Sequence, residues 1–257
     1  MLTLAGAEIG RIGLGTNRLT ATPANEEFLR EAVAAGVGLI DTAHLYTGGE
    51  SERAVGAALA PFPAGLVVAT KAGYRRGSGH PDALRAQVEE SLARLRTESI
   101  ALLYLHRVDP ETPLEQSLAA IKEYRDAGRV REVGISEVGV EQIERAREIV
   151  PIAAVQNNYS LSERKHDEVV DLCAERGIVF VPYFPLRGGA GPAIDEIASR
   201  HGATPAQIAL AWLLERSPAV LPIPGTLSWE HLRENLGALE IDLTEDEYRN
   251  LSASRVS

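Results

Sequence analysis

Short apolar runs alternate with longer amphipathic segments along almost the whole chain, and this alternation restricts the fold more than any other feature. Each run is too short for a typical helix and is apolar on both faces, as strands of a covered parallel sheet are. The runs lie at residues 11–15, 38–41, 66–70, 100–105, 132–136, 153–157, 178–182 and 220–224.

Helix signals occupy the intervals between these runs. Asn25 is a candidate N-cap and Gly36 a candidate stop for the first helix, and Thr244 and Glu247 have the spacing of a capping box at the start of the last one. The predicted helices span residues 25–35, 50–60, 81–96, 114–127, 141–149, 163–176, 205–216, 230–236 and 244–251.

Eight strand-like runs with helices between them predict one closed (β/α)8 TIM barrel of the α/β class, forming a single domain over residues 1–257. Residues 2–10 precede the first expected strand, and we expect them to form a β-hairpin that plugs the bottom of the barrel. The alternative is a doubly wound open sheet, which predicts Gly-x-Gly-x-x-Gly after the first strand. Gly13 and Gly15 lack the third glycine of that motif.

The composition limits the classes of partner. A formal net charge of −10 argues against nucleic acid and anionic lipid, because both repel an acidic chain. The single cysteine, Cys173, excludes an intrachain disulfide, and we expect it to be a small buried apolar residue. The N-terminus has no signal-peptide pattern, and no run approaches the roughly 18 apolar residues of a membrane span. We therefore expect a cytoplasmic protein with no nucleic-acid or membrane partner.

Ionisable residues follow the apolar runs where a barrel places its active site, at the carboxyl ends of the strands. Asp41 ends the second run and is followed by Tyr46, Lys71 ends the third, and His106 ends the fourth. Each of these residues alone has an ordinary structural interpretation, such as a cap, a solvated charge or a packed ring. Their joint occurrence on three successive strands indicates a catalytic site.

This set of side chains suits reduction of a carbonyl, which requires a proton donor beside a hydride source. The Tyr46 phenol is the candidate acid, and a nearby Lys71 ammonium is expected to lower its pKa. Asp41 would hold Lys71 charged and oriented. His106 would orient the carbonyl oxygen or donate to it.

Motifs that occur in order from about Gly13 to Asn235 resemble those of the aldo-keto reductase family. They are Ile-Asp-Thr-Ala-His-Leu-Tyr at 40–46 with Glu-Ser-Glu-Arg at 50–53, Val-Ala-Thr-Lys at 68–71, and the segments 103–109, 127–136, 155–160, 223–226 and 231–235. The resemblance implies a (β/α)8 barrel without metal, NAD(P)H-dependent reduction of aldehydes or ketones, and a catalytic tetrad of Asp41, Tyr46, Lys71 and His106. Segments 106–110 and 223–226 resemble short microbial branches that contain pyridoxal and general aldehyde reductases.

The resemblance also implies an extended NADPH across the barrel mouth. Ser136 and Gln156 would bind the nicotinamide carboxamide, Tyr183 would stack on the nicotinamide ring, and Arg187 would lie near the pyrophosphate. The implied cofactor-binding residues are Gly15, Thr16, Asp41, Ser136, Gln156, Tyr183, Pro185, Leu186, Gly188, Gly225, Thr226, Ser228, His231, Glu234 and Asn235.

The sequence departs from the family pattern in two places. Glu137 stands where an asparagine is frequent, and a carboxylate accepts hydrogen bonds but cannot donate them. No lysine or arginine stands at Gly225, Leu227 or His231, where relatives place one for the 2′-phosphate of NADPH. We therefore expect NADPH from the resemblance, with NADH or dual use as the alternative.

Loop residues would line the substrate pocket, and the candidates are Asn17, His44, Tyr74, Arg107 and Tyr159. Arg107 is expected either to meet a carboxylate or phosphate of the substrate or to form an ion pair with Asp109 or another neighbour. Because the chain ends at Ser257, soon after its last expected helix, we expect an open, shallow pocket. The family is commonly monomeric, and we expect a monomer.

Other functions remain as alternatives on the sequence alone. A nicotinamide-binding sensor or regulatory subunit would keep the fold with little turnover. An aldolase would use Lys71 in a Schiff base, and a metalloenzyme would use Asp41, His44 and His106. The aldolase does not account for Ser136, Gln156 and Thr226, and the metal site lacks a further pair of ligands at the strand ends.

Overall fold

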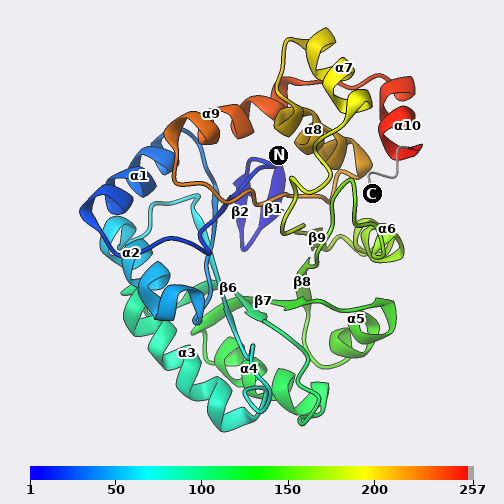
Figure 1. The fold of residues 1–257 in the computed structure, drawn as a ribbon. Helices are drawn as coiled ribbons and strands as arrows, with labels where there is room; N and C mark the ends of the chain where they lie inside the picture. The colour runs from blue at the N-terminus through cyan, green and yellow to red at the C-terminus, as the bar shows by residue number, and fades with distance from the viewer. Residues whose placement is uncertain (254–257) are drawn as a thin grey trace.

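Parallel strands form the centre of the molecule and follow one another around it in chain order (Figure 1). The computed structural model describes residues 1–253, so the last four residues of the expected domain lie outside the described range. Within that range the central sheet has seven strands, and each pairs with the next in parallel. They are β3 (Leu14–Gly15), β4 (Leu39–Asp41), β5 (Val67–Ala72), β6 (Ile100–Leu105), β7 (Val130–Ser136), β8 (Ile152–Gln156) and β9 (Val179–Phe180).

The eighth position of the barrel is occupied by residues 219–225, which form bridges rather than the predicted regular strand. The Leu221 N–H donates to Phe180 at 2.9 Å on one side, and the Gly13 N–H donates to Pro222 at 3.0 Å on the other. Pro222 and Pro224 have no N–H, so this segment lacks two ladder donors. It nevertheless closes the ring between β9 and β3, and the expected (β/α)8 barrel is confirmed.

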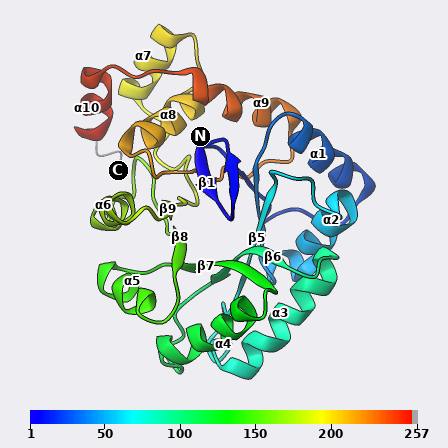
Figure 2. The same ribbon diagram turned by 180° about the vertical axis from the view of Figure 1, so that it is seen from behind.

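Helices surround the ring, as both ribbon views show (Figures 1 and 2). They are α1 (Pro23–Ala34), α2 (Glu50–Leu59), α3 (Pro81–Leu95), α4 (Leu114–Asp126), α5 (Val140–Arg147), α6 (Asp167–Arg176), α7 (Pro192–His201), α8 (Pro205–Arg216), α9 (Trp229–Gly237) and α10 (Glu245–Ala253), with short 3-10 turns η1 (Tyr46–Gly49) and η2 (Ala238–Glu240). None of those in residues 1–253 has the length and apolar character needed to cross a bilayer.

Three helix predictions need correction. The first helix is capped by Thr22 rather than Asn25, because the Thr22 side chain accepts from the Asn25 N–H. Helix α6 starts at Asp167, four residues later than expected, because Ser160 and Glu163 pair in a tight bridge. Helix α7 was missed, although Pro192 at its start and the spacing of its buried apolar residues Ile194, Ile197 and Ala198 are helix signals.

The predicted N-terminal hairpin is present as β1 (Leu2–Leu4) and β2 (Ala7–Ile9), and it lies in the middle of the ring in both views (Figures 1 and 2). Ala5 and Gly6 have positive φ angles of 49° and 77°, which suit a two-residue hairpin turn. Leu4 and Ile9 are buried in one apolar cluster with inward-facing residues of the barrel strands. The hairpin therefore closes the amino-terminal end of the barrel, where Gly38 lies against Ile9.

Candidate active site

Three adjacent strands deliver the predicted catalytic residues to one end of the barrel. Asp41 is the last residue of β4, Lys71 lies near the end of β5, and His106 directly follows β6. The strands pair in register, with Asp41 opposite Ala69 and Lys71 opposite Tyr104. The side chains of all three residues are buried at the carboxyl end of the sheet, where barrel enzymes place their catalytic groups.

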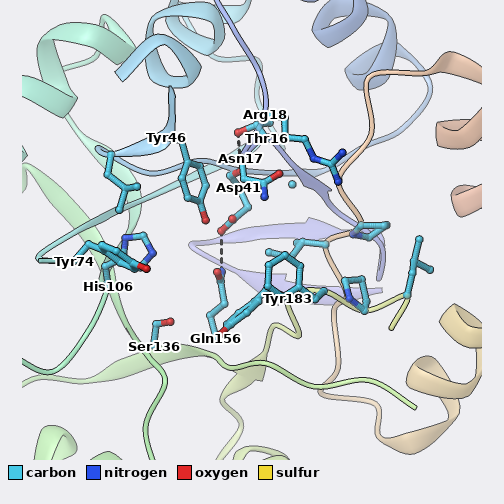
Figure 3. Close-up of a pocket in the computed structure, with 18 of the residues that line it drawn as sticks. Thr16, Asn17, Arg18, Asp41, Tyr46, Tyr74, His106, Ser136, Gln156 and Tyr183 are labelled. Carbon is cyan, nitrogen blue, oxygen red and sulfur yellow. Dashed lines mark hydrogen bonds between the residues drawn. The ribbon is translucent and has the colours of Figure 1, made fainter. Parts of the chain in front are cut away.

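Lys71 is the hub of the hydrogen-bonded group. Its Nζ donates to Asp41 Oδ1 at 2.5 Å, to the Thr42 carbonyl at 2.7 Å and to the Tyr46 hydroxyl at 3.1 Å. The other carboxylate oxygen of Asp41 accepts from Gln156 Nε2 at 2.8 Å, a bond drawn in Figure 3. Both oxygens of Asp41 are therefore engaged inside the protein, and the three donors of Lys71 are all used.

A strained turn brings Tyr46 to Lys71. Tyr46 begins η1, where Thr47, Gly48 and Gly49 have positive φ angles of 48°, 67° and 89°. Glycine adopts this region without steric cost, but threonine does not. The Thr47 hydroxyl donates to the Leu19 carbonyl at 2.7 Å and accepts from the Ser51 N–H at 3.1 Å, which stabilises the turn. The turn directs the phenol of Tyr46 back into the barrel mouth.

The pKa of Tyr46 is raised, not lowered as the sequence suggested. Burial disfavours the phenolate and outweighs the opposing effect of the Lys71 ammonium. The pKa of Lys71 is also raised: burial opposes its charge, but Asp41 and Tyr46 together favour the charged form more strongly. At neutral pH the site therefore holds a protonated phenol beside an ammonium.

His106 is a neutral imidazole in this site. Burial, with the positive charges of Lys71 and Arg107, lowers its pKa to about 2. The ring lies 6.0 Å from that of Tyr46 and 4.8 Å from that of Tyr74, measured between centroids. Its Nδ1 is buried and has no hydrogen-bond partner among residues 1–253. An imidazole of this kind donates or accepts a hydrogen bond without changing charge.

A cavity of about 480 Å³ opens directly over these groups (Figure 3). It is lined by Gly15, Thr16, Asn17, Arg18, Asp41, Leu45, Tyr46, Tyr74, His106, Arg107, Ser136, Gln156, Tyr183, Phe184, Pro185, Leu186, Arg187, Ile223, Pro224 and Gly225. A second cavity shares Gly15 to Arg18 and Gly225 with it and continues to Thr226, Ser228 and His231. The two together form an elongated site.

Most of the residues expected to bind the cofactor line these two cavities, and three do not. Gly188, Glu234 and Asn235 lie outside both linings. Gly15 is required for the close approach of the chain there, because a Cβ at this position would lie 2.8 Å from the Ile223 carbonyl oxygen. The side chains of Gln156, Ser136 and Tyr183 all line the main cavity (Figure 3).

The donors along the site suit an extended dinucleotide. Polar groups and an aromatic ring at one end suit a nicotinamide, and Arg18 and Arg187 suit phosphate oxygens. At the far end Ser228 caps the N-terminus of α9, which favours an anion. The residues present therefore fit a nicotinamide dinucleotide.

Two of the five substrate-pocket candidates lie away from the main cavity. His44 Nε2 pairs with Glu90 at 2.9 Å, and His44 lines a smaller neighbouring cavity that shares Leu45 and Tyr74 with the main one. Tyr159 is fully buried, stacks on Trp212, and interacts through its hydroxyl with Asp167 and Arg216. Asn17, Tyr74 and Arg107 do line the main cavity.

Glu137 is also absent from the linings of both cavities. Its backbone has a positive φ of 58°, and its Oε1 accepts from the Asn158 N–H at 2.7 Å. Burial opposes its charge, but this bond and the hydroxyl of Tyr183 lower its pKa overall. The carboxylate is thus engaged with the protein.

Arg18 lines the main cavity but was not among the site residues predicted from the sequence. It lines both cavities and is exposed there. It follows the expected residues Gly15, Thr16 and Asn17 directly, so its position after the first strand was a usable signal.

Comparisons with known proteins agree with this architecture. The family model of the "Aldo/keto reductase family" matches residues 11–192 and 190–255. Pyridoxine 4-dehydrogenase of Escherichia coli is 36% identical over 270 residues, covering 95% of this chain and 94% of that protein. An uncharacterized oxidoreductase of Schizosaccharomyces pombe is 36% identical over 263 residues, covering 95% of this chain and 86% of the other.

Solved structures show the same relationship. A thermostable aldo-keto reductase in complex with the inhibitor epalrestat has a TM-score of 0.89 at 34% identity, covering 98% of both chains. An aldo/keto reductase of Klebsiella pneumoniae in complex with NADP and acetate has a TM-score of 0.84 at 28% identity, covering 95% of this chain and 90% of that one. From the family match and the geometry of the site together, the chain belongs to the aldo/keto reductase family of NAD(P)H-dependent oxidoreductases.

Proposed function

We propose that this enzyme reduces aldehydes or ketones to alcohols with NADPH, and that Tyr46 is the proton donor. The observation that carries the proposal is the contact of Lys71 Nζ with both Asp41 at 2.5 Å and the Tyr46 hydroxyl at 3.1 Å, beneath a cavity of about 480 Å³. The proposed roles of the catalytic residues rest on this geometry.

Each residue has a distinct task in the proposed reaction. Ser136, Gln156 and Tyr183 would hold the reduced nicotinamide, which when bound would supply the hydride. The Tyr46 hydroxyl gives its proton to the carbonyl oxygen, and the Lys71 ammonium stabilises the phenolate left behind. Asp41 keeps Lys71 charged in a buried position. Neutral His106 donates a hydrogen bond to the carbonyl oxygen and aligns it with the phenol.

NADPH is the cofactor that we propose over NADH. Arg18 and His231 line the far cavity, where the Arg18 guanidinium would attract a phosphate and the His231 ring could hydrogen-bond to it. The Klebsiella pneumoniae relative was solved with NADP, which supports the same choice. Residues 225–231 contain no lysine or arginine, so NADH remains the second candidate. Fluorescence titration with both nucleotides tests the choice, and equal affinities would contradict it.

For the substrate we propose an aromatic aldehyde of the pyridoxal type as the first compound to assay. The similarity to pyridoxine 4-dehydrogenase supports this choice. The exposed ring of Tyr74 beside His106 would pack against an aromatic substrate. The assay panel is 4-nitrobenzaldehyde, methylglyoxal and pyridoxal.

The substitution Tyr46→Phe tests the proposed function. We expect kcat for 4-nitrobenzaldehyde to fall by about 100- to 10,000-fold, because the proton donor is lost. The dissociation constant for NADPH should change little. Tyr124→Phe is the matched control, since the Tyr124 hydroxyl lies on α4 and bonds to Glu89 at 2.9 Å. Unchanged turnover in Tyr46→Phe would overturn the assignment, and nucleotide binding by the native enzyme without turnover of any panel compound would favour a sensor.

A further inference from the structure

Arg107 is a cation outside the tetrad that interacts electrostatically with His106 and Tyr46. It follows His106 at the carboxyl end of β6, is partly buried and lines the main cavity. The sequence left two roles open for it, an ion pair with Asp109 or another neighbour, or contact with a carboxylate or phosphate of the substrate. The contacts of both side chains decide between these roles.

Asp109 is engaged elsewhere. It is 5% exposed, its Oδ2 accepts from the Gly79 N–H at 2.9 Å, and its Oδ1 accepts from the Glu111 N–H at 3.0 Å. Glu137 is near enough to interact electrostatically with Arg107, but its Oε1 accepts from the Asn158 N–H. Within residues 1–253 Arg107 forms hydrogen bonds and ring contacts but no ion pair.

The guanidinium is nevertheless held firmly. Its Nη1 donates to the His106 carbonyl at 3.0 Å and to Ser136 Oγ at 3.0 Å. The group lies 5.5 Å from the ring centroid of Tyr74 and 5.8 Å from that of Tyr183. Nη2 has only a long contact of 3.4 Å to the Tyr183 hydroxyl, and Nε has no hydrogen bond to residues 1–253. The guanidinium is therefore anchored through Nη1, and N–H donors on Nη2 and Nε remain for a ligand.

The charge around the cavity favours an anion. Its charged lining residues are Arg18, Arg107, Arg187 and Asp41. Both oxygens of Asp41 are already paired, with Lys71 and Gln156. Arg18 and Arg187 suit the phosphates of the cofactor, so of these lining cations Arg107 is the one left for an anionic group of the substrate when NADPH is bound.

We propose that Arg107 binds a carboxylate of the substrate, so that among aromatic aldehydes the enzyme prefers those that carry a carboxylate and converts them to hydroxy acids. The proposal rests on the reductase function proposed above. A planar, anchored guanidinium matches a carboxylate with two parallel hydrogen bonds. The ring of Tyr74 contacts both Arg107 and His106. A substrate in which about one aromatic ring separates the carboxylate from the carbonyl would therefore reach Arg107 and His106 together.

The test compares 4-formylbenzoate with its methyl ester, which differ in charge but have the same reacting aldehyde. With saturating NADPH, we expect kcat/KM of the native enzyme to favour the acid by about 10-fold or more, mainly through KM. In Arg107→Gln the ratio of the two kcat/KM values should fall by about 10- to 100-fold, the range for a lost hydrogen bond to a charged group. Arg107→Lys keeps the positive charge but loses the planar guanidinium, so its ratio of the two kcat/KM values should lie between those of the native enzyme and Arg107→Gln.

Arg131→Gln is the matched control. Arg131 is exposed on β7 and lies outside both cavity linings, so this variant carries the same charge change and should leave the ratio unchanged. Far-ultraviolet circular dichroism verifies that each variant folds. If Arg107→Gln does not fold, Arg107→Lys provides the test.

Equal kcat/KM values for acid and ester in the native enzyme, or an unchanged ratio in the Arg107 variants, would overturn the role of Arg107 while leaving the reductase function intact. Reduction of 4-nitrobenzaldehyde distinguishes failure of this inference from failure of the proposed function. If this compound is reduced but the acid is not preferred over the ester, only the role of Arg107 is contradicted. No reduction of any of the three compounds contradicts the proposed function and this inference with it.

Discussion

The side chains of His106, Tyr46 and Lys71 lie close together in the site, yet their pKa values shift for different reasons. Burial dominates the shifts of His106 and Tyr46, and it keeps the first neutral and the second protonated. Lys71 is more deeply buried than either but remains charged because Asp41 pairs with it directly. The ammonium thus stabilises a phenolate only when one forms during the reaction.

These protonation states predict a flat pH profile. With a neutral aldehyde and saturating NADPH, kcat/KM should vary little between about pH 5.5 and 9, because His106 with a pKa of about 2 stays neutral and Tyr46 stays protonated. Above the raised pKa of Tyr46 the rate should fall, since the proton donor is lost. A break near pH 6.5 that disappears in His106→Gln would show that His106 titrates normally and would contradict this site.

At the scale of elements, a buried carboxylate ties the helices to the turn that carries Tyr46. Glu52 on α2 is fully buried, and it accepts from the Thr70 hydroxyl at 2.6 Å and from Arg94 Nη1 at 3.3 Å. The same Nη1 of Arg94, on α3, donates to the His44 carbonyl at 3.1 Å. Arg94 therefore joins α2, α3 and the segment between β4 and η1.

Removing this arginine should be costly. Arg94→Met leaves the Glu52 carboxylate buried without its ion-pair partner, and we expect the free energy of unfolding to fall by about 3 kcal/mol, the lower end for a broken buried pair because Arg94 reaches solvent. Urea unfolding measures the change. Arg129→Met, which breaks an exposed pair with Glu89, should cost about 1 kcal/mol or less. Equal losses in the two variants would show that the pair of Glu52 and Arg94 is no stronger than a surface contact.

At the scale of the whole molecule, the hairpin and the barrel strands share one apolar cluster, although they are far apart in sequence. Leu4 and Ile9 share a cluster with residues of β4, β5, β6, β8 and β9 and with Leu221 and Ile223 of the closing segment. A second, larger cluster fills the layer between strands and helices. We propose that these layers unfold together, as a single domain.

Ile9→Ala tests this proposal. Ile9 is 1% exposed, and truncating a buried isoleucine leaves a cavity that we expect to reduce the free energy of unfolding by about 2–4 kcal/mol. The loss should appear as a shift of one cooperative transition, and added NADPH should move that same transition upward. Two separate transitions, of which only one responds to NADPH, would contradict the single domain.

Much of the local structure was predictable because it depends on local patterns. Apolar runs and caps placed the barrel strands and nearly all helices within a few residues, since burial on both faces and capping are encoded in neighbouring residues. The prediction was less accurate in two places, one because of a local turn and one because of tertiary pairing. The bridge at Ser160 and Glu163 delayed α6, and prolines in residues 220–224 reduced a predicted strand to bridges that only the neighbouring strands define.

The sequence by itself determined the family motifs, the alternation that specifies a barrel, and which residue types stand at the ends of its strands. The tertiary structure decided which of those residues meet. It brought Asn17, Tyr74 and Arg107 into the main cavity, directed His44 toward Glu90, and buried Tyr159 against Trp212. It also reversed the expected pKa shift of Tyr46, because the desolvation of a phenol depends on everything packed around it and not on its neighbours along the chain.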